Sequence, residues 1–364
     1  MTLEVSRAPR THLDRVRSLI AAANVDALLI LKTENRRYAT GFTGSAGLAL
    51  VTRTEELLAV DFRYEEQAAE EAPGWILLRG GRDPLGALVA ALDGRGVARI
   101  GFEAEFVPYA QAARLREKLV PAELVPLNDV DRLRWVKDTA EVAAISRAVE
   151  IADAAYDRVL GMLRPGLSER DAAVELETFM RRGGAERVAF DSVLASGPRS
   201  ALPHGRATDR VMGPGEFVTL DFGAVWGGYC SDITRTVVLG EADEQQRRVY
   251  GVVLDAQRQA LEMIRAGIPC RDVDARARSV IADAGYGAAF GHSLGHGVGL
   301  EVHEGPRLSP LEDAALEAGM VLTVEPGIYL PGWGGVRIED TVVVADGGCR
   351  ILTRAPKAFR VLPA

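Results

Sequence analysis

Two pairs of acidic residues, each placed symmetrically about a predicted turn, stand in two largely apolar segments that read as β-hairpins, and this arrangement restricts the fold most strongly. The first segment, TLDFGAVWGGYCSDITRT, covers residues 219–236. We place its turn at residues 226–228, because glycine supplies the positive φ of a tight turn. Asp221 and Asp232 are equally far from a centre between positions 226 and 227, which predicts that they oppose each other. Opposed side chains have Cβ atoms roughly 4.5–5.5 Å apart, and two carboxylates at that distance repel each other. The pair therefore needs a bound cation, a shared proton, or a bulge that separates the two acids.

The second segment, LTVEPGIYLPGWGGVRIEDTVVV, covers residues 322–344 and repeats this arrangement. Glu325 and Glu339 are symmetric about Gly332, which predicts a second carboxylate pair near the arms of a second hairpin. Alternation along the second arm places Arg337 and Glu339 on one face of the strand and their apolar neighbours on the other. Either pair alone is more simply explained as acids that flank a hairpin and face solvent. Two such pairs in otherwise apolar strands, together with the histidine cluster described next, favour a functional site.

Histidine is rare in this chain but clustered. Three of the five histidines, His292, His296 and His303, lie within FGHSLGHGVGLEVHEGP, residues 290–306. The first two have the spacing of helical zinc proteases, but Ser293 occupies the position of the general-base glutamate. Each glycine of the segment would cost roughly 1 kcal/mol in a helix. We therefore predict loop and strand, with glycines that let the backbone pass close to a bound group.

The first part of the chain alternates helix and strand signals, which predicts a compact α/β domain over residues 1–130. Its glycine-rich stretch, GFTGSAG at 41–47, lacks the G-x-G-x-x-G spacing of a dinucleotide site, and we interpret it as a turn. Thr11 is the predicted N-cap of the first helix. Strands are predicted at 26–32, 48–52, 56–60, 75–79 and 97–102, and helices at 11–23, 64–72, 84–92 and 108–119.

The second part, residues 131–364, mixes helices with long hairpins, which favours an α+β domain. Asp138 and Glu141 fit a capping pair for a helix that runs to about residue 160. Further helices are predicted at 168–182, 243–266 and 271–284, and strands around 187–197 and 216–226.

Composition narrows the functional classes. A length of 364 residues suggests two domains, because single cores stop growing at roughly 250–300 residues. The net charge of −8 argues against a nucleic-acid partner, and no apolar run reaches the ~20 residues of a membrane span. The three cysteines are few and odd in number, which suggests reduced thiols and a cytoplasmic protein. Cys230 lies near the acidic pairs, but we interpret it as a small strand residue.

The motifs LDFGAVWGGYCSDITRT, GHSLGHGVGLEVHEGP, LTVEPGIYLP and GVRIEDT resemble those of the pita-bread metallopeptidases. More specifically, the chain resembles the Xaa-Pro peptidases, prolidase and aminopeptidase P. RYATGFTGSAG and DFRYEEQA resemble the smaller N-terminal domain of that group. The resemblance implies an α+β pita-bread catalytic domain preceded by a creatinase-like α/β domain.

The resemblance also implies roles for individual residues. Asp232 and Glu339 would bridge two divalent metal ions, Asp221 would complete one site, and His296 with Glu325 the other. Oxygen-rich ligation with one imidazole suits Mn²⁺, with Co²⁺ or Zn²⁺ as alternatives. His204, His303 and Glu325 would handle protons or stabilise the oxyanion, and His292 and Arg337 would lie on the substrate side.

The expected reaction is metal-dependent hydrolysis of the peptide bond before proline, with small proline-containing peptides as substrates. We favour an Xaa-Pro dipeptidase over an aminopeptidase P that acts on longer peptides, and the family suggests a homodimer. Arg36, Arg37 and Arg63 are candidates to bind the carboxylate of a dipeptide. Methionine aminopeptidase is disfavoured because it lacks such an N-terminal domain, and creatinase because it lacks the metal ligands. A pita-bread binding module without catalysis is the alternative from another class.

Overall fold

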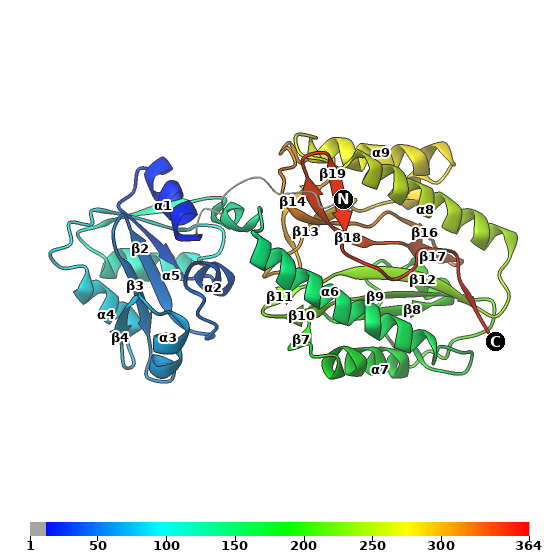
Figure 1. Cartoon of the computed structure of the whole chain (residues 1–364), viewed down its shortest axis with the longest axis horizontal. Helices are drawn as coiled ribbons and strands as arrows, with labels where there is room; N and C mark the ends of the chain where they lie inside the picture. Colours follow the sequence, from blue (N-terminus) through cyan, green and yellow to red (C-terminus); the bar gives the residue numbers. More distant parts are fainter. Residues whose placement is uncertain (1–11, 364) are drawn as a thin grey trace. The chain divides into compact units, whose positions relative to one another are not determined.

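The structure is a computed structural model that describes residues 12–363 (Figure 1). The described residues up to Arg134 form one compact unit and those from Trp135 onward form another, where the sequence predicted a boundary at residue 130. The predicted N-cap at Thr11 lies outside the described residues. None of the described helices is both long enough and apolar enough to cross a membrane.

The N-terminal unit is a six-stranded sheet in the order β4-β3-β2-β1-β5-β6, with helices on both faces. Strand β1 shows why both faces are covered. Its residues Leu28 and Ile30 pack with α1, α2 and α3, whereas Ala27 and Leu29 pack with α4 and α5. The elements are α1 (His12–Ala22), β1 (Ala27–Ile30), α2 (Thr33–Thr40), β2 (Leu48–Thr52), β3 (Glu56–Val60), α3 (Glu65–Glu71), β4 (Ile76–Arg79), α4 (Pro84–Ala91), β5 (Arg99–Glu103), α5 (Tyr109–Lys118) and β6 (Glu123–Leu127).

The sequence predictions located every element of this unit except α2 and β6. Helix α2 contains Arg36, whose side chain is only 1% exposed. The Arg36 guanidinium donates to the carbonyls of Gly44 (2.6 Å) and Gly47 (2.9 Å), so it organises the 41–47 loop. Because the guanidinium is buried against backbone carbonyls of its own unit, the structure disfavours Arg36 as a ligand for a substrate carboxylate. Arg63 is exposed and forms an ion pair with Asp61 (2.7 Å).

The C-terminal unit places two helix pairs outside a set of sheets (Figure 1). Helices α6 and α7 pack on the sheet β20-β12-β9-β8, and α8 and α9 pack on the sheet β14-β13-β15-β18-β19. The helices are α6 (Thr139–Leu160), α7 (Glu169–Arg182), α8 (Glu244–Met263) and α9 (Cys270–Asp283). The strands are β7 (Arg187–Val188), β8 (Val193–Ser196), β9 (Phe217–Phe222), β10 (Ala224–Trp226), β11 (Tyr229–Cys230), β12 (Ile233–Leu239), β13 (Gly295–Gly297), β14 (Glu304–Leu308), β15 (Val321–Val324), β16 (Gly327–Leu330), β17 (Gly334–Arg337), β18 (Asp340–Ala345), β19 (Gly348–Ile351) and β20 (Val361–Leu362).

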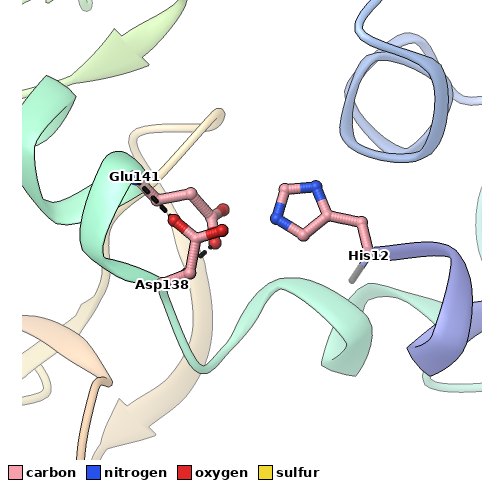
Figure 2. Close-up of side chains that lie close together, drawn as sticks. All are labelled: His12, Asp138 and Glu141. Carbon is pink, nitrogen blue, oxygen red and sulfur yellow. Dashed lines mark hydrogen bonds between the residues drawn. The ribbon is translucent and has the colours of Figure 1, made fainter. Parts of the chain in front are cut away.

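The predicted capping pair starts helix α6 (Figure 2). The Asp138 carboxylate accepts from the Glu141 backbone N–H, and the Glu141 carboxylate accepts from the Asp138 N–H, both at 2.9 Å. This reciprocal box satisfies two backbone donors that a helix start otherwise leaves unpaired. The prediction is confirmed.

Candidate metal centre

The second acidic hairpin has the predicted register. Gly327 pairs with Arg337 in the ladder of β16 and β17, five residues on either side of Gly332. Val324 pairs with Asp340 in the ladder of β15 and β18 with the same symmetry. Glu325 and Glu339 lie between these two ladders, at positions that the shared register places opposite each other.

The first hairpin has a different register from the predicted one. Trp226 pairs with Tyr229, so Gly227 and Gly228 alone form the turn, with φ values of 57° and 78°. A two-residue turn of this kind needs positive φ at both central positions, which glycine adopts and tryptophan resists. As a result, Asp221 lies opposite Thr234, and the prediction that it opposes Asp232 is wrong. Alternation still directs Asp221, Thr234 and Asp232 to one face, with the two acids diagonal to each other.

His296 lies at the centre of β13, and the predicted absence of a helix here is confirmed. The flanking glycines are required by close strand packing rather than by a bound group. A Cβ on Gly295 would lie 2.0 Å from the Thr323 carbonyl oxygen, and one on Gly297 would lie 2.2 Å from that of Gly305. Only glycine fits at either position.

The folded chain brings the predicted ligands together. One donor atom from each of Asp232, His296 and Glu339 lies within 4.8 Å of the others. Nε2 of His296 is 3.6 Å from Oδ2 of Asp232 and 3.4 Å from Oε1 of Glu325. Asp232, His296 and Glu339 are buried, and Asp221 and Glu325 are partly exposed.

Electrostatic repulsion inside this centre is strong. Burial raises the pKa of Asp232 and of Glu339 well above the ordinary range, and their acidic neighbours raise both further. Burial also raises the pKa of Glu325 to about 8. Carboxylates that repel one another in a buried site indicate that a bound cation normally neutralises them.

The His296 ring turns Nε2 toward the acidic side chains. Its Nδ1 lies 3.0 Å from the Gly297 carbonyl oxygen, an arrangement that protonates Nδ1 and leaves Nε2 facing the acids. Burial, followed by the neighbouring His303, lowers the pKa of His296 to about 3, so the imidazole is neutral. A neutral imidazole is the form that binds metals.

Arg337 begins a chain of hydrogen bonds that includes a residue the sequence did not reveal. Its guanidinium donates to Asp221 (2.6 Å) and to the hydroxyl of Tyr329 (2.8 Å). That hydroxyl lies 2.9 Å from Nε2 of His292, whose Nδ1 faces the Ser293 carbonyl oxygen at 2.8 Å. Both ring nitrogens of His292 are therefore engaged within the protein, and its place on the substrate side stays a prediction.

Two threonine hydroxyls, also missed from the sequence, hold the glutamates. Thr234 accepts from Nε of Arg337 (3.0 Å) and donates to Glu339 (2.7 Å). Thr323 donates to Glu325 (3.3 Å) and accepts from the His296 backbone N–H (3.0 Å). Threonine is common in strands for packing reasons alone. Thr234 lies opposite Asp221, which is a signal the sequence could have provided, whereas Thr323 lies opposite Thr341.

His303 and His204 are both exposed residues. The His303 ring is 4.4 Å from the His296 ring, and the part of the ring that is desolvated there lowers the pKa of His303. His204 interacts electrostatically with His303 and His292. The loop that carries His204 is anchored at both ends by the buried carboxylate of Glu169.

That anchor is a set of hydrogen bonds. The Glu169 carboxylate accepts from the backbone N–H of Ser196 (2.8 Å) and of Thr208 (3.1 Å), and from both hydroxyls (2.9 and 2.7 Å). Arg199, inside the loop, donates to Glu169 (3.2 Å) and to the Arg206 carbonyl (2.6 Å). The loop is therefore fixed on both sides of His204.

The donor set fits divalent metal ions. Four carboxylates and one neutral imidazole provide the oxygen-rich ligation that Mn²⁺ and related ions prefer. These five predicted ligands also have supporting contacts of the kind found around metal sites, from Thr234, Thr323, Arg337 and the Gly297 carbonyl.

Comparison with known proteins identifies the family to which the chain belongs. Residues 143–346 match the model of metallopeptidase family M24, and residues 12–136 match that of the creatinase/prolidase N-terminal domain. The chain belongs to metallopeptidase family M24, whose members use divalent metal ions. The predicted family and the pita-bread α+β fold with a creatinase-like N-terminal domain are confirmed.

Within this family, the chain is similar to proteins named Xaa-Pro dipeptidase or X-Pro aminopeptidase. The chain is similar to an Xaa-Pro dipeptidase from Bacillus anthracis, with 42% identity and a TM-score of 0.94 over 96% of this chain and 99% of that one. It is also similar to an X-Pro aminopeptidase from Thermotoga maritima, with 41% identity and a TM-score of 0.89 over 96% and 100% of the two chains. An Xaa-Pro dipeptidase from Pyrococcus horikoshii is 41% identical over 92% of this chain and 94% of its own length.

Proposed function

We propose that the protein is an Xaa-Pro dipeptidase that hydrolyses the peptide bond before proline with two divalent metal ions. The observation that carries this proposal is the buried convergence of Asp232, His296 and Glu339, with Glu325 beside His296. The relatives named Xaa-Pro dipeptidase support the substrate class. The relative named X-Pro aminopeptidase is nearly as similar, so substrate length requires its own test.

In this proposal Asp221, Asp232, His296, Glu325 and Glu339 would hold the ions, and Asp232 and Glu339 would be the ligands that the two ions share. Bound ions of this kind lower the pKa of a water molecule and polarise a carbonyl group. We favour Mn²⁺ because four of the five ligands are carboxylates, and Co²⁺ and Zn²⁺ are the alternatives. Metal analysis of the purified protein, with activity measured after each ion is restored, tests this choice.

The protein side chains supply proton transfer and orientation. Glu325 accepts a proton from the attacking water at its carboxylate. His204 and His303 stabilise the oxyanion or protonate the proline nitrogen, which belongs to a tertiary amide and leaves only when protonated. Arg337 and His292, joined through Tyr329, orient Asp221 and the substrate side of the centre.

Substrate length separates the two activities. We compare kcat/KM for Ala-Pro, Ala-Pro-Ala and Ala-Pro-Ala-Ala with Mn²⁺, and use Ala-Ala to test the need for proline. A charge-assisted bond to the dipeptide carboxylate contributes about 1.5–3 kcal/mol, so Ala-Pro should be preferred by roughly 10- to 150-fold. Equal or faster cleavage of the longer peptides would identify an aminopeptidase instead.

A matched inactive variant excludes contaminating peptidases. Glu339→Gln keeps the size of the side chain but removes a bridging charge, so it should abolish metal-dependent hydrolysis. If the wild-type protein binds metal but cleaves none of the peptides, the binding-module alternative replaces the proposal.

We also propose a cytoplasmic homodimer. Support comes from the three cysteines, all free in the described residues, and from the family resemblance. Light scattering coupled to size-exclusion chromatography measures the oligomeric state, and a monomeric mass at micromolar concentration would contradict the dimer.

A further inference from the structure

The two proposed bridging ligands come from strands of different sheets. Asp232 directly precedes β12, and Glu339 directly precedes β18. Two hydrogen bonds join the strands next to these ligands. The Glu339 N–H donates to the Thr234 carbonyl (3.1 Å), and the Thr341 hydroxyl donates to the Asp232 carbonyl (2.7 Å). The distance between the bridging carboxylates therefore depends on how these two strands are held together.

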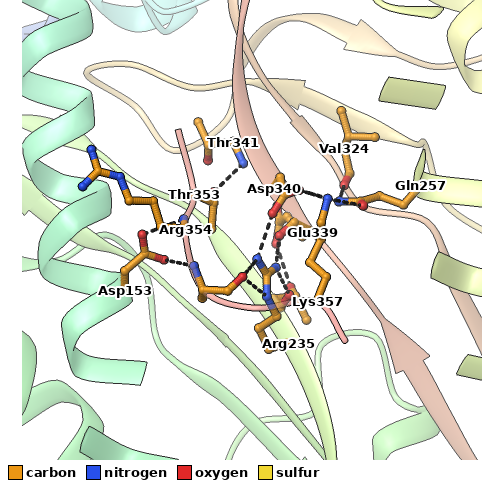
Figure 3. A network of polar contacts seen from close by, with 12 residues as sticks. Asp153, Arg235, Gln257, Val324, Glu339, Asp340, Thr341, Thr353, Arg354 and Lys357 are labelled. Carbon is orange, nitrogen blue, oxygen red and sulfur yellow. Dashed lines mark hydrogen bonds and ion pairs between the residues drawn. The ribbon is translucent and has the colours of Figure 1, made fainter. Parts of the chain in front are cut away.

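A buried ion pair lies behind this junction (Figure 3). The Arg235 side chain, on β12, is 1% exposed and donates to Asp340 of β18 at 2.8 Å. The same guanidinium donates to the backbone carbonyl of Glu339 and to that of Thr234 (2.9 Å). Arg235 thus contacts the main chain of one bridging ligand from the strand that carries the other.

The partners of this pair are themselves fixed. The second carboxylate oxygen of Asp340 accepts from Gln257 of α8 (3.0 Å) and from Lys357. Arg235 also donates to the Ala355 carbonyl at 2.7 Å. Figure 3 shows the C-terminal segment at this point, where Asp153 of α6 accepts from its backbone N–H groups at 2.8 and 3.0 Å. The ion pair therefore connects both strands to helices on opposite sides of the unit.

A buried ion pair is a weak device for stability, because desolvation of the two charges offsets their attraction. It is effective at fixing geometry, since a planar guanidinium with five donors allows few arrangements. We propose that Arg235 and Asp340 are positioning residues that hold Asp232 and Glu339 at the separation required by two metal ions. This inference rests on the proposed ligand set.

The test is a titration of the metal-free protein with Co²⁺ alone, followed by calorimetry and by visible absorption. Arg235→Lys keeps the charge but loses the fork that reaches the Glu339 carbonyl. We expect the first ion to bind as in the wild type, the second to bind at least 10-fold more weakly, and the absorption band of the doubly loaded form to change. Excess Co²⁺ should restore kcat while KM for Ala-Pro stays constant.

Asp340→Asn is the second variant, because it keeps the shape of the partner and removes its charge. It should weaken the binding of the second Co²⁺ ion in the same way. If Arg235→Lys does not fold, Asp340→Asn alone tests the positioning role. Ile281→Val, in the apolar core of α9, is the control for a general loss of stability. If the folded variants bind two ions as tightly as the wild type and the control, the positioning role is refuted.

A third arm separates this inference from the ligand assignment. Glu339→Gln should lose high-affinity Co²⁺ binding if Glu339 is a ligand. If Glu339→Gln binds two ions normally, the ligand set is wrong, whatever the ion-pair variants do. If Glu339→Gln loses Co²⁺ and Arg235→Lys with Asp340→Asn keep both ions, only the positioning role fails.

Discussion

Once the metal ions are removed, the free energy of unfolding of the C-terminal unit should fall as the pH rises from about 6.5 to about 8. The perturbation is a chelator, which leaves the buried acids without a compensating cation. Glu325 then has a pKa of about 8 in the folded protein, against an ordinary value of 4.5. Between these values the folded protein holds a proton that the unfolded chain has released, so the free energy of unfolding decreases with rising pH.

The magnitude follows from linkage. One retained proton gives a slope of about −1.4 kcal/mol per pH unit, or about 2 kcal/mol over this window. For a unit of this size that lowers the melting temperature by about 4–8 °C. The pKa values of Asp232 and Glu339 are also raised well above the ordinary range, and a second retained proton would double the effect.

The range from about pH 6.5 to about 8 excludes the contribution of the histidines, which would oppose the predicted loss of stability. Burial lowers the pKa of His292 to about 4 and that of His296 to about 3, from 6.5. Because the pKa of each histidine is lower in the folded protein than in the unfolded chain, the two histidines add stability as the pH rises toward 6.5. Above pH 6.5 both are neutral in the folded and in the unfolded protein, so they contribute no further change. The carboxyl groups therefore dominate the window.

The assay is differential scanning calorimetry of chelated and Mn²⁺-loaded protein in the same buffers. Metal binding requires deprotonated carboxylates, so the loaded protein should lack the downward slope. Glu339→Gln removes one of the repelling charges and should flatten the slope of the metal-free form. Parallel pH dependences for chelated and loaded wild-type protein would refute the reasoning.

Three further variants test individual residues. His204→Ala should keep both metal ions and lose roughly 10²–10⁴-fold in kcat, measured by metal analysis and steady-state kinetics; loss of metal would instead make His204 a ligand. Tyr329→Phe leaves two buried partners without their hydroxyl and should cost about 1–3 kcal/mol in urea unfolding, whereas unchanged stability would contradict its bridging role. Arg36→Met should destabilise the N-terminal unit by a similar amount, because carbonyls of the 41–47 loop lose their donor. A selective loss of dipeptide preference in this variant would restore Arg36 as a substrate-binding residue.

The two hairpins show what a sequence can predict about such a centre. The Glu325 and Glu339 register follows from symmetry about Gly332, and the structure has that register. The first hairpin was misplaced because Trp226 was counted within a turn that only the two following glycines form. The acids still share a face, because an even shift in register preserves alternation.

Other features depend on tertiary contacts that the sequence does not carry. Helix α2 has few apolar residues, and its buried face is built from polar side chains such as Asn35 and Arg36. Periodicity of apolar residues therefore gives no signal for it. In the sequence Tyr329 cannot be distinguished from any other tyrosine in a strand. Its role is visible only in the fold, which brings Arg337 and His292 to its hydroxyl.

The glycines on either side of His296 limit how this centre can change by mutation. Because neither Gly295 nor Gly297 has room for a Cβ, the imidazole cannot be moved one position along β13 in either direction. A new ligand can replace His296 only at its own position. Laboratory evolution toward a different metal should therefore accumulate substitutions at the carboxylates and their supporting hydroxyls, while the two glycines stay unchanged.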